Sequence, residues 1–255
     1  MPIGTGPDGP DPEELDRAFT RTGARAFYAQ PTFANPSGVL WDQALGRAVL
    51  DVVRARGAFL IEDDWAHDLG IDAGPRPLAA LDEDGHVIYL RSLTKSVSPA
   101  LRVAAVLARG PARQRILADR AAESMYVSGL VQAAALDVVT QPGWRRHRRT
   151  LGQRLGMRRD LLLDSVRRHI PDAEVARVPA GALNLWLRLP DATDATDVAR
   201  VAAEAERRGV IVAPGDEWFP AEPSGPFLRL NYAGESPERY DEACAVLGQA
   251  IAAAA

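Results

Sequence analysis

The sequence contains one lysine, Lys95, although Lys and Arg together occupy 30 of its 255 positions. Lysine is normally among the commonest residues of a globular protein. Arginine stays protonated and cannot form an imine, whereas an ε-amine can lose its proton and attack a carbonyl group. The lone lysine therefore suggests a chemical role for its amine. The alternative is a general replacement of lysine by arginine that left one surface lysine by chance.

Cysteine, excess charge and long apolar segments are also scarce. The single cysteine, Cys244, excludes an internal disulfide, fits a reducing compartment and lies in a helical pattern that predicts a core position. The net charge of -4 gives no reason to expect nucleic-acid binding by this chain alone. No run approaches the ~20 apolar residues of a membrane span, and the start lacks the regions of a signal peptide. We expect a cytoplasmic protein that does not contact the membrane.

Short apolar runs alternate with amphipathic segments in the first part of the chain. Apolar runs without alternation are typical of strands buried on both faces, and their alternation with helices predicts a largely parallel α/β sheet. Asp11 is the expected N-cap of the first helix, and residues 1–12 are otherwise expected to form a loop. The predicted strands are Arg25–Gln30, Ala58–Ile61, His86–Leu90 and Val103–Ala108, and the predicted helices are Pro12–Thr22 and Asp42–Gly57.

Helical patterns dominate the middle of the chain, from Pro111 to Ile170, with a break near Gln141–Gly143. Seven arginines between Trp144 and Arg159 could bind nucleic acid, but a solvated helix face near an anion or a partner subunit fits the net charge better. The C-terminal part predicts a compact α+β unit. Its expected elements are the strands Ala182–Leu189, Val210–Ala213 and Phe227–Tyr232 and the helices Asp194–Gly209 and Pro237–Ala253.

Polar groups follow three of the predicted strands. They are Asn35, Asp63 and the segment Ser92–Arg102. Because ligands gather at the carboxyl ends of parallel strands, we expect these groups to lie at one edge of one sheet. His67 and His86 lack metal-ligand spacing, so no metal site is predicted.

A lysine amine, a carboxylate, an amide and a phosphate-binding segment are what pyridoxal 5'-phosphate requires. Its aldehyde forms a Schiff base with a lysine, and an ionised carboxylate keeps its ring nitrogen protonated so that the ring can act as an electron sink. Its phosphate suits hydroxyl donors, arginine and a helix N-terminus.

Four segments, in order, resemble the motifs of the class I/II (fold type I) aminotransferases. They are Ala34–Gly38, Ile61–Trp65, Ser92–Arg102 and Phe227–Tyr232. The sequence is most similar to the aminotransferase-like domain of MocR-type regulators and their free-standing relatives, from about residue 11 to residue 251. The resemblance implies an aspartate aminotransferase-like α/β fold with a mostly parallel sheet. It assigns residues 1–110 to a truncated large domain, 111–165 to a linking helical segment and 166–255 to a small α+β domain.

The resemblance implies a role for each matching residue. Lys95 would form the Schiff base and act as catalytic base, Asp63 would pair with the pyridine nitrogen, and Asn35 would bond the ring hydroxyl. Ser92 and Arg102 would bind the phosphate. Structural alternatives remain: Asn35 could be only a turn residue, Asp63 or Ser92 could be a cap, and Arg229 could pair with a structural carboxylate.

Two further features concern the substrate and the cofactor ring. Arg229 matches the family's arginine that binds the substrate α-carboxylate, a bidentate task suited to a guanidinium group. Trp65 stands where the family commonly has a tyrosine that bonds the ring oxygen, and an indole offers only an N–H donor. Between Met1 and Tyr28 the sequence lacks the family's glycine-containing phosphate loop and its ring-stacking aromatic residue. The resemblance therefore implies an uncovered sheet edge and apolar surface.

Three functional hypotheses follow. The first is an aminotransferase that acts on an amino acid and a 2-oxo acid and forms a homodimer, as the family does. The second is a domain that senses the cofactor and an amino acid without turnover, as part of a transcription regulator. The third is an inactive fragment that binds no cofactor.

Overall fold

A computed structural model describes residues 1–123, 126–190 and 195–254. The chain forms two compact units. The first unit contains residues 3–34 and 39–152, and the second contains Asn35–Gly38 and the chain from Gln153 onward. The predicted division at residues 110 and 165 stays a prediction. None of the described helices is long and apolar enough to cross a membrane.

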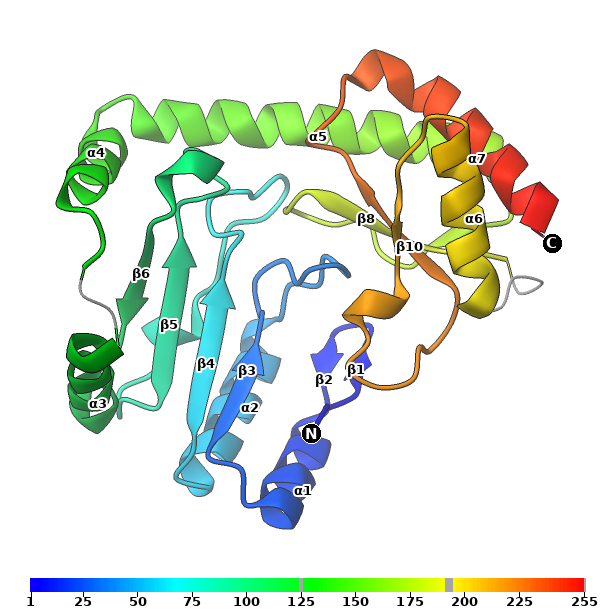
Figure 1. The fold of residues 1–255 in the computed structure, drawn as a ribbon. Coiled ribbons are helices and arrows are strands. Elements are labelled where there is room, and N and C mark those ends of the chain that lie inside the picture. The colour runs from blue at the N-terminus through cyan, green and yellow to red at the C-terminus, as the bar shows by residue number, and fades with distance from the viewer. Residues whose placement is uncertain (124–125, 191–194, 255) are drawn as a thin grey trace. The chain divides into compact units, whose positions relative to one another are not determined.

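The first unit is built on a four-stranded sheet in the order β3-β4-β5-β6 (Figure 1). The pairs β3–β4 and β4–β5 are parallel, which confirms the mostly parallel sheet, and β6 runs antiparallel to β5. The strand predicted over Val103–Ala108 is confirmed as β6, but its predicted burial is wrong, because all four residues of β6 are exposed. The strands are β3 Ala26–Ala29, β4 Phe59–Asp64, β5 Val87–Ser92 and β6 Ala104–Leu107.

Two capped helices pack against this sheet and complete its core. In α1 (Pro12–Thr22) the Asp11 side chain accepts from the Glu13 N–H, which confirms the predicted cap. In α2 (Gln43–Ala55) the Asp42 side chain accepts from the Leu45 N–H. The core includes the buried side chains of Leu15, Phe19, Trp41, Val49, Leu50, Val53, Leu60, Val87 and Tyr89.

Two differences from the predictions concern local geometry. The segment predicted as a loop before α1 contains a short hairpin of β1 (Thr5–Gly6) and β2 (Gly9–Pro10). β4 continues through Asp64, so the acidic group lies in the strand and does not follow it. Because successive side chains of a strand point to opposite faces, Glu62 and Asp64 are buried on one face while Asp63 lies on the other.

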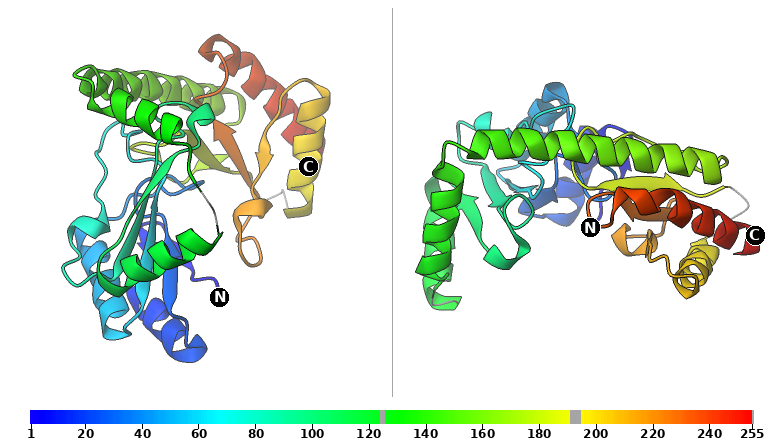
Figure 2. Two further views of the ribbon diagram at one scale, coloured as in Figure 1. Left: turned by 60° about the vertical axis from the view of Figure 1, so that its left-hand side comes forward. Right: turned by 90° about the horizontal axis from the view of Figure 1, so that it is seen from above.

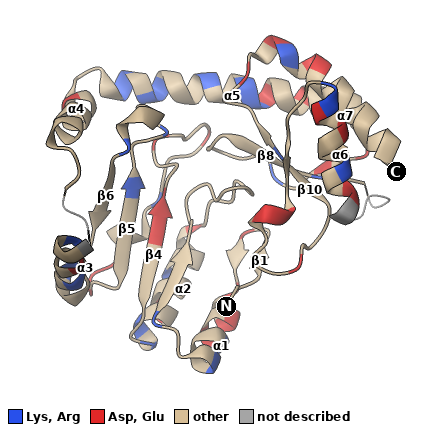
Figure 3. Ribbon diagram, viewed as in Figure 1, with Lys and Arg blue, Asp and Glu red and all other residues tan. Residues whose placement is uncertain are grey.

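Three helices follow the sheet: α3 (Gly110–Glu123), α4 (Gly129–Thr140) and α5 (Trp144–His169). The break predicted near Gln141–Gly143 is confirmed, since Gln141 is extended and ends α4. α5 is one long helix whose residues belong to the first unit up to Gly152 and to the second unit beyond it (Figure 2). Basic residues lie along its length (Figure 3).

β6, α3 and the segment before α4 expose apolar side chains, which we call the apolar edge surface. It comprises Val106, Leu107, Leu117, Tyr126 and Val127. Val106, Leu107 and Leu117 line one hollow, and Tyr126 and Val127 line another.

The second unit contains an antiparallel sheet in the order β7-β8-β10-β9. Its helices α6 (Ala195–Arg207) and α7 (Tyr240–Ala254) pack against each other, and Cys244 on α7 is buried as predicted. The strand predicted over Val210–Ala213 is wrong in its extent, since only Ala213 of that run pairs in the sheet and Ile211 is exposed. Asp194, the predicted start of a helix, lies outside the described residues. The strands are β7 Glu174–Val175, β8 Asn184–Arg188, β9 Ala213–Pro214 and β10 Phe227–Asn231.

Candidate functional site

Asp63 lies near the carboxyl end of β4, where one side chain of β3 and one that directly follows β3 bind its carboxylate. The Tyr28 hydroxyl donates to Asp63 Oδ2 over 2.6 Å, and Gln30 Nε2 donates to the same oxygen over 3.0 Å. Burial, followed by the hydrogen bond to Asp63, raises the pKa of Tyr28 to about 12. The sequence did not single out Tyr28 or Gln30, although their place at the end of a strand parallel to β4 was a usable signal.

Lys95 follows the end of β5 in a compact turn. The turn is closed by two backbone hydrogen bonds, from Val97 N to Leu93 O over 3.0 Å and from Leu93 N to Val103 O over 3.2 Å. Ser92 Oγ accepts from the Thr94 N–H over 3.2 Å. The Lys95 side chain is exposed. The turn therefore presents the amine at the same end of the sheet that carries Asp63.

Arg102 and Trp65 complete the predicted residues of the first unit. Arg102 has a left-handed backbone, with φ of 48°, directly after the short 3-10 helix Pro99–Leu101, and it is exposed. The Trp65 indole N–H is buried and has no hydrogen-bond partner among the described residues. A buried donor without an acceptor costs free energy, so this N–H suits an acceptor atom of a ligand.

Arg229 lies on β10 in the second unit, where it donates a hydrogen bond to Asn35, the amide predicted from the sequence. Its Nη1 donates to Asn35 Oδ1 over 3.2 Å. Its guanidinium carbon lies 4.1 Å from the centre of the Trp218 ring, a cation–π arrangement that limits the orientation of the side chain. Burial lowers the pKa of Arg229, while the charge of Glu217 acts in the opposite direction.

Two asparagines that sequence reasoning missed extend this contact. Asn184 Nδ2 donates to Asn35 Oδ1 over 3.4 Å, and Asn231 Nδ2 donates to Asn184 Oδ1 over 3.1 Å. Asn184 and Asn231 face each other across the β8–β10 pair. The sequence held no signal for this pair, because the contact depends on the register of β8 and β10. Because Asn35 Oδ1 accepts from two N–H groups, the orientation of the Asn35 amide is fixed.

An aromatic cluster lies on the other side of Arg229. Trp186 is opposite Arg229 in the β8–β10 pair, and its ring stacks on Phe227 at 4.8 Å between centroids. Trp218 and Phe219 lie 6.3 Å and 6.0 Å from Trp186. Arg229 thus emerges between an amide cluster and an aromatic cluster on one face of the sheet.

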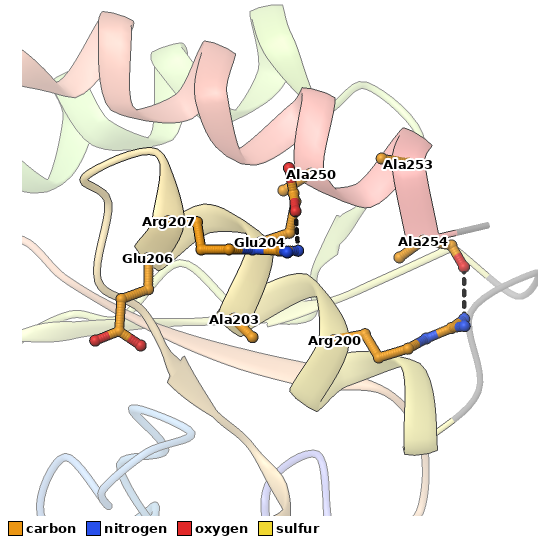
Figure 4. Close-up of a pocket in the computed structure, with 8 residues that line it drawn as sticks. All are labelled: Arg200, Ala203, Glu204, Glu206, Arg207, Ala250, Ala253 and Ala254. Carbon is orange, nitrogen blue, oxygen red and sulfur yellow. Dashed lines mark hydrogen bonds and ion pairs between the residues drawn. The ribbon is translucent and has the colours of Figure 1, made fainter.

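A separate hollow of about 580 Å³ lies between α6 and α7 (Figure 4). An ion pair of Arg207 with Glu204 and a hydrogen bond from Arg200 to the Ala254 carbonyl border it. None of the residues predicted to act in catalysis or binding lines it. Across residues 1–123, 126–190 and 195–254, no cluster of three or more His, Cys, Asp or Glu side chains could hold a metal ion.

The residues of the first unit fit pyridoxal phosphate. A lysine amine, a carboxylate held by two neutral donors, a hydroxyl and an arginine occur at neighbouring strand ends. The orphaned indole N–H of Trp65 provides a further donor. Within the second unit, Arg229 and Asn35 suit a carboxylate and an acceptor oxygen.

Comparison with known proteins identifies similar chains. The profile of the family described as aminotransferase class I and II matches residues 9–247. An uncharacterized HTH-type transcriptional regulator of Bacillus subtilis, YdfD, is 27% identical over 94% of this chain and 49% of its own length. The 2-aminoadipate transaminase of Thermus thermophilus is 28% identical over 98% of this chain and 63% of its own length. The chain thus spans about half to two thirds of these relatives.

The solved structures include a similar fold over the whole chain. The α-aminoadipate aminotransferase LysN from Thermus thermophilus, solved with N-(5'-phosphopyridoxyl)-L-leucine, superposes with a TM-score of 0.88. It is 26% identical, and the match covers 100% of this chain and 65% of that one.

Proposed function

The chain belongs to the class I and II aminotransferase family, and we propose that it transfers an amino group between an amino acid and a 2-oxo acid with pyridoxal phosphate. The observation that carries the proposal is the position of Lys95. The only lysine of the chain follows the end of β5, next to the strand whose end carries Asp63.

Residues of the first unit would hold the cofactor. Lys95 would bind it covalently through the ε-amine, and the same amine, once displaced by the amino group of the substrate, would move the α-proton. Asp63, kept in place by Tyr28 and Gln30, holds the proton on the pyridine nitrogen. Ser92 and Arg102 bind the phosphate with a hydroxyl and a guanidinium donor. The bound cofactor supplies an electron sink for the carbon that loses its proton.

Residues of the second unit would orient the substrate and the cofactor ring. Arg229 binds the α-carboxylate, and its stack on Trp218 and its contact with Asn35 restrict the guanidinium to few orientations. The Asn35 amide, whose oxygen accepts from Arg229, would have its own N–H group for the ring oxygen of the cofactor. Trp65 would add its indole N–H to the cofactor site.

An amino-transfer assay tests this function. The full chain loaded with pyridoxal phosphate is mixed with an amino acid and a 2-oxo acid, and both products are quantified by mass spectrometry. We expect both products to form in equal amounts, and the matched variant Lys95→Arg, which retains the charge but cannot form the covalent bond, to form neither. Absence of turnover with a panel of amino acids, in a chain that binds the cofactor, would contradict the enzymatic proposal.

A sensing role is the second candidate, because YdfD, an HTH-type regulator, is similar over half of its length. In this case the chain binds the cofactor and an amino acid but does not exchange the amino group. Rapid mixing of the loaded chain with amino acids separates the two candidates. A spectral change on binding that is not followed by release of a 2-oxo acid favours sensing.

We further propose that the chain acts as a homodimer in the cytoplasm. The apolar edge surface supports a partner, since Leu107, Leu117 and Tyr126 are 54%, 52% and 92% exposed. Light scattering should give twice the 27.5 kDa mass of one chain. A mass of one chain at micromolar concentration would contradict the dimer.

A further inference from the structure

His147, near the start of α5, binds the backbone of the Lys95 segment. Its Nε2 lies 3.0 Å from the carbonyl oxygen of Ser96, the residue after Lys95. Because a carbonyl oxygen only accepts, Nε2 must carry the hydrogen in this contact. The imidazole stacks on Trp144 with 5.2 Å between ring centroids and 23° between planes, which holds the ring orientation.

Arg148, the next residue of α5, anchors the same region through a buried carboxylate. Its Nη1 lies 3.1 Å from Asp68 Oδ1, and the same oxygen accepts from Arg91 Nη2 over 2.9 Å. The Asp68 side chain is only 1% exposed, and Arg91 directly precedes Ser92 on β5. Burial acts to raise the pKa of Asp68, but the charge and hydrogen bonds of Arg91, with smaller contributions from His67 and Ser96, hold that pKa below its usual value.

Close backbone packing fixes this part of α5 against the segment that follows β4. A Cβ atom at Gly152 would lie 2.5 Å from the carbonyl oxygen of Gly70, so a larger residue cannot occupy this position without a shift. His147 therefore projects from a helix that is held at Arg148 and at Gly152. A donor on such a helix can fix the backbone of the turn it contacts.

We propose that His147 is a positioning residue for the Lys95 amine, acting through the Ser96 carbonyl, with Arg148, Asp68 and Arg91 as its anchor. The inference rests on the proposed function, because it assumes that Lys95 reacts with the cofactor. Lys95 itself is exposed, so the direction of its side chain depends on the backbone of its turn. The His147 hydrogen bond restrains the Ser96–Val97 peptide group, which begins one residue after Lys95.

Hydrogen exchange of the cofactor-free chain tests the contact itself. The variants are His147→Ala, His147→Gln, which retains an N–H donor, and His169→Ala as a control at the other end of α5, where His169 contacts Asp241. We expect His147→Ala to speed amide exchange in the Leu93–Val97 turn by roughly threefold to tenfold, the effect of one lost hydrogen bond. His147→Gln should restore part of the protection, and His169→Ala should leave it unchanged.

Cofactor attachment tests the positioning of the amine. The rate of attachment to Lys95 is followed by absorbance at increasing pyridoxal phosphate concentration. In His147→Ala we expect the limiting rate to fall by roughly tenfold, because the amine is misplaced, while the half-saturating concentration stays unchanged because Ser92 and Arg102 still bind the phosphate. A merely structural loss would instead weaken phosphate binding and lower thermal stability together.

Three results would overturn the inference. They are equal exchange in His147→Ala and the wild type, equal effects of His147→Ala and His169→Ala, and an unchanged limiting rate in His147→Ala. If the wild-type chain does not bind pyridoxal phosphate at Lys95, the proposed function fails. The exchange measurement still decides whether His147 fixes the turn.

Discussion

Replacement of the buried Glu62 gives a quantitative test of how β4 is held beside Asp63. The Glu62 side chain is fully buried, and its two oxygens accept from the backbone N–H groups of Leu78 and Ala79 over 2.8 and 2.9 Å. Burial raises the pKa of Glu62 from 4.5 to about 7, with a smaller contribution from Asp64, while the two N–H donors act to lower it.

This shift predicts a loss of stability as the pH rises. A raised folded-state pKa means that the folded chain binds the proton more tightly than the unfolded chain, so the free energy of unfolding is highest below pH 4.5. It falls as the pH rises through about 7. At roughly 1.4 kcal/mol per pKa unit, ionisation of Glu62 lowers the free energy of unfolding by about 3 kcal/mol.

The variant Glu62→Gln isolates this contribution, because Gln does not titrate. Gln provides one acceptor in place of two and leaves one buried N–H unpaired, so near pH 4.5 the wild type should be more stable by roughly 1–3 kcal/mol. Urea unfolding between about pH 4.5 and pH 8 should show this advantage shrinking by about 3 kcal/mol. An advantage that is constant or grows with pH would refute the reasoning, because the N–H donors would then outweigh burial.

Three further predictions concern the side chains of the candidate site. Arg229→Lys keeps the charge but loses bidentate binding, so the Kd of the loaded chain for an amino acid should rise roughly tenfold, and an unchanged Kd would exclude a carboxylate role. Trp218→Leu removes the cation–π contact, so KM should rise roughly twofold to tenfold at constant kcat, and a fall in kcat alone would contradict this. The pKa of Tyr28, raised to about 12 by burial and by Asp63, should fall in Asp63→Asn. Tyrosinate absorbance during a pH titration measures this pKa, and Tyr28→Phe identifies the signal of Tyr28. The same titration curve in Asp63→Asn and the wild type would contradict the prediction.

The sequence predicted the elements of the first unit from residues with a local signal. Asp11 predicted the first helix through its capping position, and the apolar runs predicted β3, β4 and β5. The direction and exposure of β6 were not predictable, because an apolar run gives neither its pairing partner nor what covers it. The extent of β9 was predicted wrongly for a similar reason, because its residues form a strand only through their pairing with β10.

The residues of the candidate site likewise fall into those that a local sequence signal predicts and those that depend on long-range pairing. Lys95, Asp63 and Ser92 could be placed because each lies at or just beyond the end of a predicted strand. Asn184 and Asn231 could not, since they are 47 positions apart in the chain and their contact depends on the register of two strands. Sequence reasoning placed Asn35 with the sheet of Asp63, whereas the structure groups it with the second unit, where it binds Arg229.

Covalent attachment at Lys95 is the central claim, and its direct test is borohydride reduction of the chain loaded with pyridoxal phosphate, followed by peptide mass spectrometry. Because the chain has only one lysine, the assignment involves no other side-chain amine. The account predicts one pyridoxyl group per chain, located on Lys95 and absent from Lys95→Arg. A chain that retains pyridoxal phosphate but gives no pyridoxyl group on Lys95 after reduction would contradict it.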